Sequence, residues 1–226
     1  MNKILIVTTN YSGCECNKAD CKCIKDTGVW LEEFFTPYLV FKDAGIDVVI
    51  ASLKGGISPM DKNSMEQAKA EDIETATKLL NNTQKLSEIK LDDFDGMFIP
   101  GGHGPMFDLA NSEELAKAIE YFYHSNKVIS AVCHGPAGLI NAKRENGKSI
   151  LDGKRMTSFT NKEENMSGLS DLVPFLLETK LKELGAEFEN GEPWQENVVV
   201  DEKLVTGQNP QSSKLLAEKV LEKLLA

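Results

Sequence analysis

Short apolar runs alternate with longer segments of helical periodicity along this chain, and no other feature constrains the fold as strongly. The runs are continuously apolar, which is typical of parallel strands that are buried on both faces. Strands and helices in regular succession predict an open, doubly wound α/β sheet of flavodoxin-like type, with helices on both faces. The expected strands are residues 3–9, 47–53, 96–102, 128–133 and 155–160.

Helical periodicity fills most of the segments between these runs. Near the carboxyl end, two further short strands are expected around the turn at residues 201–203. Residues 54–95 are polar and lack a strand-like run, so we expect an insertion, mainly helical, over one edge of the sheet. No repeat or low-complexity linker divides the chain, which favours one domain over residues 1–226. The expected helices are residues 28–44, 65–80, 112–125, 135–142, 170–185 and 211–225.

Composition narrows the classes of partner. Of the 226 residues 41% are apolar, and the formal net charge is −10. Nucleic acids and anionic membranes favour basic surfaces, so neither is an expected partner. No apolar run approaches the length of a membrane span, and the first residues resemble a buried strand more than a signal peptide. We expect a cytoplasmic protein, in which cysteines serve catalysis or metal binding more often than structural disulfides.

Cys133 ends the expected strand 128–133 and is followed by His134, Gly135 and Pro136. Ligands of doubly wound sheets bind at the carboxyl ends of the strands, and glycine and proline suit a sharp turn like that of a nucleophile elbow. Free N–H groups at the start of the next helix are expected to favour a thiolate. The N–H of His134 is a candidate for one half of an oxyanion hole. The alternative is a buried structural cysteine.

Two other segments supply candidates for the same site. The loop at residues 100–105 also follows a strand, so Gly102 is a candidate oxyanion donor and His103 a candidate for substrate binding. A tight loop without a ligand is the alternative. In the helix at 28–44, Glu33 shares an apolar face, whereas Glu32 lies on a wetter one. An inward Glu33 would be desolvated, which raises a carboxyl pKa and suits an acid/base catalyst.

Several motifs together resemble the ThiJ/PfpI superfamily, which has the class I glutamine amidotransferase-like fold. The resemblance covers nearly the whole chain and is specific to a branch that contains heat-shock chaperones and glutathione-independent glyoxalases of the glyoxalase III type. The motifs are AVCHGPA, GGHG, TGVWLEEFFTPY, FTNKEEN, VPFLLE and LVTGQNPQSS.

The resemblance assigns roles to particular residues. It implies that Cys133 is the nucleophile, that His134 is its base and that Glu33 is the acid beside the thiol. Glu164, with Glu163 as the alternative, would orient the base, since a base histidine needs a carboxylate. The backbone N–H groups of residues 102 and 134 would bind the oxyanion.

The same resemblance implies a reaction. The thiolate adds to the aldehyde of methylglyoxal or glyoxal, protons move between the two carbons, and hydrolysis of the thioester gives lactate or glycolate, with no cofactor. Relatives are also described as protein deglycases. A protease- or amidase-type hydrolase is one alternative function, and a stress chaperone without essential thiol chemistry is another. A homodimer is expected because symmetric dimers are the commonest oligomers.

A cluster of four cysteines departs from the family pattern. Cys14, Cys16, Cys21 and Cys23 follow the first expected strand with the spacing C-x-C-x(4)-C-x-C. Four thiolates within ten residues can hold one zinc ion tetrahedrally, although the spacing is not the common C-x(2)-C pair. A disulfide that forms under oxidation is a second interpretation, and a solvated loop without a role is a third. Trp194 and residues 206–210 are expected at the far edge of the sheet, as support for substrate rather than for catalysis.

Overall fold

A computed structural model describes residues 2–14, 24–66 and 68–226 of the chain. Within them, seven strands form one sheet in the order β3-β2-β1-β4-β5-β9-β8. All neighbouring strands are parallel except β8, which pairs with β9 in an antiparallel hairpin at one edge. This confirms the predicted fold class. The strands are β1 Lys3–Thr8, β2 Asp47–Ser52, β3 Gln84–Lys85, β4 Gly96–Ile99, β5 Val128–Val132, β8 Val198–Asp201 and β9 Leu204–Gly207.

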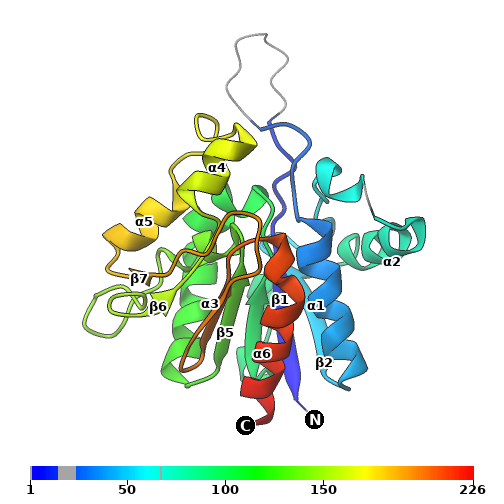
Figure 1. Ribbon diagram of the computed structural model, residues 1–226. Coiled ribbons are helices and arrows are strands. Elements are labelled where there is room, and N and C mark those ends of the chain that lie inside the picture. The colour runs from blue at the N-terminus through cyan, green and yellow to red at the C-terminus, as the bar shows by residue number, and fades with distance from the viewer. Residues whose placement is uncertain (1, 15–23, 67) are drawn as a thin grey trace.

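The continuous apolar runs are explained by two hydrophobic cores, one on each face of the sheet. Along β1, Ile4 and Ile6 face one core and Leu5 and Val7 face the other, because successive strand residues point to opposite faces. Helices α1 (Leu31–Asp43) and α6 (Ser213–Leu225) pack together over the first core, and α3 (Glu113–His124) covers the second. Figure 1 shows the sheet between these helices.

Some predicted elements differ from the structure. The expected strand 155–160 is wrong: only Arg155–Met156 (β6) is extended, and it pairs with β7 (Glu187–Phe188) in a separate two-stranded sheet. The expected helix 135–142 is a 3-10 helix over Gly135–Leu139, because two glycines and a proline disfavour an α-helix there. Helix α5 (Leu177–Glu183) is shorter than expected, and α4 (Asn161–Ser167) was not predicted.

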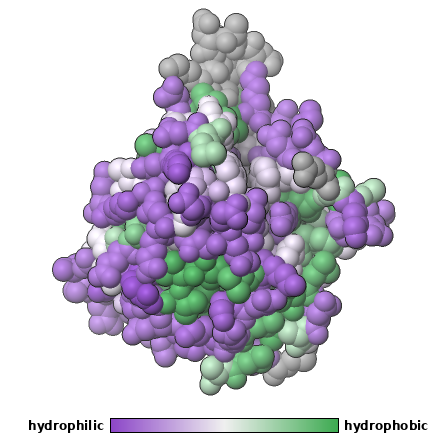
Figure 2. Space-filling model, viewed as in Figure 1, coloured by the Kyte–Doolittle hydropathy of each residue, from purple (hydrophilic) through white to green (hydrophobic). Residues whose placement is uncertain are grey.

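The segment 54–95 contains helix α2 (Ala70–Leu80), which packs against α1, and also the short edge strand β3. Among the described residues no helix has both the length and the apolar composition needed to cross a membrane. The face in Figure 2 is mainly hydrophilic, and its apolar side chains gather low, near α6. Leu225 on that helix is one of the few large apolar side chains that are exposed.

Candidate active site

The predicted site residues meet at the carboxyl ends of β4 and β5, which are neighbours in the sheet. The loop after β4 carries Gly102 and His103, and the turn after β5 carries Cys133 and His134. They line a cavity of about 460 Å³. Aromatic and aliphatic side chains form much of the rest of its lining, including Trp30, Phe159, Leu169, Leu172 and Trp194.

Cys133 occupies a strained turn, as the sequence predicts. Its φ is +58°, in the left-handed region that residues other than glycine rarely adopt. Backbone hydrogen bonds hold it on both sides: its N–H donates to Gly207 O at 3.0 Å, and its carbonyl accepts from Phe159 N at 2.9 Å. The side chain is 4% exposed. The backbone around the sulfur is therefore fixed before any substrate enters.

The two glycines before His103 are required by close packing. A Cβ at Gly101 would lie 2.5 Å from Glu33 Oε2 and 2.8 Å from the backbone nitrogen of His134. Gly102 has a φ of +84°, and a Cβ there would lie 2.2 Å from Gly28 O. These contacts let the loop backbone approach the acid and the nucleophile directly.

Glu33 points into the protein from α1, as its helical position predicts, and is fully buried, whereas Glu32 is exposed. Its Oε2 accepts a hydrogen bond from Gly101 N at 2.8 Å, and its Oε1 has no partner at hydrogen-bonding geometry. Burial raises the pKa of Glu33 well above its usual value, although the Cys133 thiol and the Gly101 N–H act in the opposite direction. The carboxyl is thus suited to carry a proton near neutral pH.

The predicted low-pKa thiolate is wrong for this state of the protein. Burial, followed by the charge of Glu33, raises the pKa of the Cys133 thiol well above its usual value, and only the Gly102 N–H opposes this shift. No α-helix begins at Gly135, so the expected helix dipole is replaced by a single 3-10 segment. Two buried acids that face each other do not both ionise readily. The thiol therefore needs a base.

His134 is placed to be that base. Its Nδ1 lies 3.3 Å from Cys133 Sγ, and its Nε2 lies 2.6 Å from Glu164 Oε2. Because a carboxylate only accepts, Nε2 carries the hydrogen and Nδ1 is left as an acceptor toward the thiol. Burial, and then the charge of His103, lower the pKa of His134, while Glu164 acts against them. The ring is consequently neutral near pH 7.

Glu164 contacts both histidines of the site. Its other oxygen, Oε1, lies 2.9 Å from His103 Nε2, and the two imidazole centroids are 4.1 Å apart. Burial acts to raise the pKa of Glu164, but His134 and His103 together outweigh it and hold the pKa well below its usual range. Between the two acids that the sequence left open, Glu164 is thus the one that contacts His134.

Glu163 points away from both histidines. Its Oε2 accepts hydrogen bonds from the backbone N–H and the hydroxyl of Thr160, and its side chain completes a capping box at the start of α4. Adjacent acids on this short helix therefore have separate surroundings.

Comparison with known proteins agrees with this geometry. Residues 23–223 match the DJ-1/PfpI family. This chain belongs to the DJ-1/PfpI family. Glyoxalase 3 of Candida albicans is 31% identical over 235 residues, which cover 98% of each chain. The crystal structure of glyoxalase III from that organism matches with a TM-score of 0.86 at 32% identity, and covers 98% of this chain and 97% of its own.

Two further relatives of this DJ-1/PfpI protein are similarly close. The glutathione-independent glyoxalase hsp3102 of Schizosaccharomyces pombe is 34% identical over 217 residues, which cover 88% of this chain and 90% of the relative. The Rapid Encystment Protein 24 KDa of Francisella tularensis has a TM-score of 0.91 at 35% identity, with 99% of each chain covered.

The structure bears on only part of the four-cysteine cluster. Cys14 is disulfide-bonded, and a sulfur in a disulfide is not a thiolate ligand. Cys16, Cys21 and Cys23 lie outside the described residues.

Elsewhere in the described chain, His103, His134 and Glu164 bring three potential metal-ligand atoms within 4.8 Å of one another. A metal ion there would have to displace the hydrogens that these groups share.

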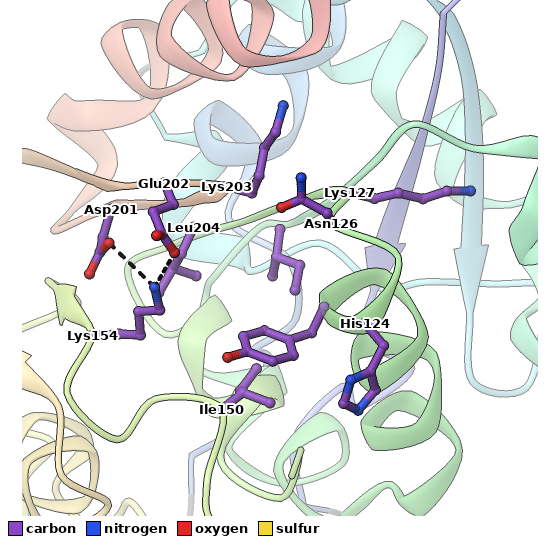
Figure 3. A pocket seen from close by; sticks show the side chains of 11 residues that line it. His124, Asn126, Lys127, Ile150, Lys154, Asp201, Glu202, Lys203 and Leu204 are labelled. Carbon is purple, nitrogen blue, oxygen red and sulfur yellow. Dashed lines mark hydrogen bonds and ion pairs between the residues drawn. The ribbon is translucent and has the colours of Figure 1, made fainter. Parts of the chain in front are cut away.

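A second cavity, of about 310 Å³, lies at the opposite edge of the sheet, where β5 and β9 begin. Lys127, Lys154 and Lys203 contribute to its lining, but each ammonium group already has partners. In Figure 3, Lys154 points to Asp201 and Glu202, and the other two lysines extend away from the group. Among the cavity's lysines none is left free to bind an anion.

Sequence reasoning missed two parts of the site. It placed Phe159 in a strand, yet this ring lies 4.5 Å from the His134 ring. It did not predict the contact between His103 and Glu164, since nothing in the spacing links the two residues. Trp194 lines the cavity, in agreement with the expected support for substrate rather than for catalysis.

Proposed function

We propose that this protein converts 2-oxoaldehydes such as methylglyoxal to 2-hydroxy acids without glutathione; its relatives are named glyoxalase 3 and glutathione-independent glyoxalase. The observation that carries the proposal is the buried chain of contacts from Cys133 through His134 to Glu164, with the Glu33 carboxyl close to the same thiol. A nucleophile, an oriented base and a carboxyl able to carry a proton are together the groups that this isomerisation needs.

The first step is activation of the thiol. Neutral His134 accepts the thiol proton at Nδ1, and the resulting imidazolium is stabilised by ionised Glu164 at Nε2. The sulfur then forms a bond to the aldehyde carbon, and the carbonyl π electrons move to oxygen. The N–H groups of Gly102 and His134 are the donors that we assign to this oxyanion. The His134 imidazolium then gives its proton to this oxygen, and the product is a hemithioacetal.

The second step moves hydrogen between two carbons. A base removes the proton from the former aldehyde carbon, and the neighbouring keto carbon becomes protonated through an enediol. We assign this transfer to Glu33, because its carboxyl lies beside the thiol and burial raises its pKa, which suits a group that accepts and releases a proton during the reaction. The result is a thioester of the 2-hydroxy acid. Water then cleaves the thioester and regenerates the thiol, and no step requires a metal or an organic cofactor.

His103 has a supporting place in this scheme. It donates to the second oxygen of Glu164, so it holds the carboxylate in the orientation that His134 uses. Burial, and then electrostatic interaction with His103, lower the pKa of His134, which favours the neutral form of the base. This makes His103 a positioning residue in our proposal, beside the role in substrate binding that its loop suggested.

The other expectations remain proposals with their own tests. A thiol hydrolase would use the same nucleophile and base, but it gives no role to Glu33. A holdase would need none of these groups.

The homodimer and the cytoplasmic location also remain proposals, and sedimentation tests the first of them. Zinc at the four cysteines first requires reduction of Cys14, so metal analysis of the reduced protein tests that proposal.

The function is tested by measuring lactate formed from methylglyoxal without glutathione, with the variants Cys133→Ala and Glu33→Gln in parallel. We expect turnover by the wild-type protein and its loss in both variants. A folded wild-type protein with reduced Cys133 and no lactate formation would refute the proposed reaction.

A further inference from the structure

The cavity at Cys133 has a mixed lining. Besides the reacting groups and polar residues such as Lys25 and Asp61, it contains a set of large apolar side chains, which are Trp30, Phe159, Leu169, Leu172 and Trp194. Its volume of about 460 Å³ falls in the range of ~300–1,000 Å³ that typically encloses drug-sized ligands. Methylglyoxal carries only a methyl group beyond its two carbonyls, so it leaves most of this apolar set untouched.

Trp194 is fixed in place by a buried acid that the proposed chemistry does not use. Its φ is +59°, a conformation that a bulky side chain seldom adopts unless its surroundings enforce it. The backbone N–H of Trp194 donates to Glu163 Oε1 at 2.9 Å, and Asn209 Nδ2 donates to the same oxygen at 2.9 Å. Because Glu163 is fully buried and Thr160 occupies its other oxygen, this anchor is rigid.

The anchored indole is linked to the catalytic base through aromatic contacts. The Trp194 ring meets Phe159 edge-on, with centroids 5.4 Å apart, and Phe159 lies 4.5 Å from the His134 ring. An apolar group bonded to the keto carbon of a substrate would extend from the sulfur along these rings. Aromatic groups favour stacked or edge-on contacts of this kind.

From these observations we propose that the preferred substrates are 2-oxoaldehydes with an aromatic or other large apolar group on the keto carbon. Trp194 is the specificity-determining residue, and Glu163 positions it. This inference rests on the proposed function and adds the substrate class. For phenylglyoxal the balanced reaction is addition of one water to give mandelate, by the same thioester route.

The test compares kcat/KM for phenylglyoxal, measured as mandelate, with kcat/KM for methylglyoxal, measured as lactate. We expect the wild-type protein to favour phenylglyoxal. In Trp194→Ala the ratio of the two constants should fall about tenfold, while Trp194→Phe should keep it within about threefold, because an aromatic wall is retained. Glu163→Gln should lower the ratio less than the alanine variant does. Cys133→Ala gives the background of mandelate that forms without the nucleophile.

The outcomes separate this inference from the proposed function. Conversion of methylglyoxal but not phenylglyoxal by the wild-type protein would overturn the substrate class and leave the function intact. A ratio unchanged in folded Trp194→Ala would overturn the role of that residue, and Lys154→Ala, at the other cavity, is the matched control that should match the wild type. If neither aldehyde is converted, the proposed function fails and the substrate class fails with it.

Discussion

Two cavities of this protein lie at opposite ends of strand β5, and they differ in what their polar groups contact. At the carboxyl edge, Cys133, Glu33 and His134 are buried and face one another, and the pKa of each is shifted from its ordinary value. At the amino edge, Lys154 is paired with Asp201 and Glu202. The groups at the carboxyl edge are placed to exchange protons with one another, whereas the charge of Lys154 at the amino edge is neutralised by its two carboxylate partners.

This difference teaches that cavity size is a poor guide to function here, since both cavities have room for a ligand. Backbone strain distinguishes the two edges only weakly, because Cys133 at one and Asn126 and Glu202 at the other all have positive φ. What separates the edges is the burial of interacting titratable groups at one of them. Such burial costs folding free energy, and it is typical of functional sites. Substitutions at each edge can test this interpretation.

The largest effect is expected at Cys133. Cys133→Ala removes the nucleophile, so lactate formation from methylglyoxal should fall by at least about a thousandfold. The assay is product formation at fixed protein concentration, with folding checked by circular dichroism. Retention of more than a few per cent of activity would place the chemistry elsewhere and would end the contrast between the edges.

The neighbouring acids of α4 offer a matched pair. Glu164→Gln keeps the shape of the side chain but removes the charge that stabilises protonated His134, so kcat should fall about 10²–10⁴-fold. Glu163→Gln should lower kcat for methylglyoxal less than tenfold, because Glu163 contacts the cavity wall and not the base. Equal losses in the two variants would contradict the separate roles that we assign to them.

Substitution of His103 should change the pH dependence of kcat/KM. Burial lowers the pKa of His134 most, and electrostatic interaction with His103 lowers it further, so His103→Gln should raise that pKa. A base with a higher pKa stays protonated to higher pH, and the acid limb of kcat/KM should therefore move upward. We expect a loss of about tenfold near pH 6 and a smaller loss near pH 8. His124→Gln, at the amino-edge cavity, is the control, and an identical profile in both variants would refute the coupling.

Most of the site could be predicted because the doubly wound fold brings strand ends together. Cys133 and Gly102 come directly after continuous apolar runs, so their meeting follows from parallel strand order, and helical spacing alone turned Glu33 inward. The pKa direction of Cys133 could not be predicted, because it depends on burial beside Glu33 and on the absence of an α-helix after Gly135. Propensity patterns do not report such contacts.

The region after β5 shows where sequence patterns lose their power. The run from 155 to 160 has strand-like composition, yet Phe159 ends in the active-site wall, because Thr160 caps α4 and turns the chain. Trp194 lies in a polar loop without periodicity, and its place depends on Glu163, 31 residues away in the chain. Long-range hydrogen bonds decide both positions, and no local signal encodes them.

The smallest effect is expected at Lys154. Lys154→Ala breaks two ion pairs, one with Glu202, whose side chain is 77% exposed, and one of 3.5 Å with Asp201, which is 17% exposed and keeps a hydrogen bond from Arg155 N. An exposed ion pair contributes about 0–1 kcal/mol, and the retained hydrogen bond limits the loss at Asp201, so the free energy of unfolding in urea should fall by about 1 kcal/mol. Turnover of methylglyoxal should stay within about twofold of the wild type. If activity fell strongly in a folded variant, the amino-edge cavity would take part in the reaction. Its paired charges would then not be evidence that it has no function.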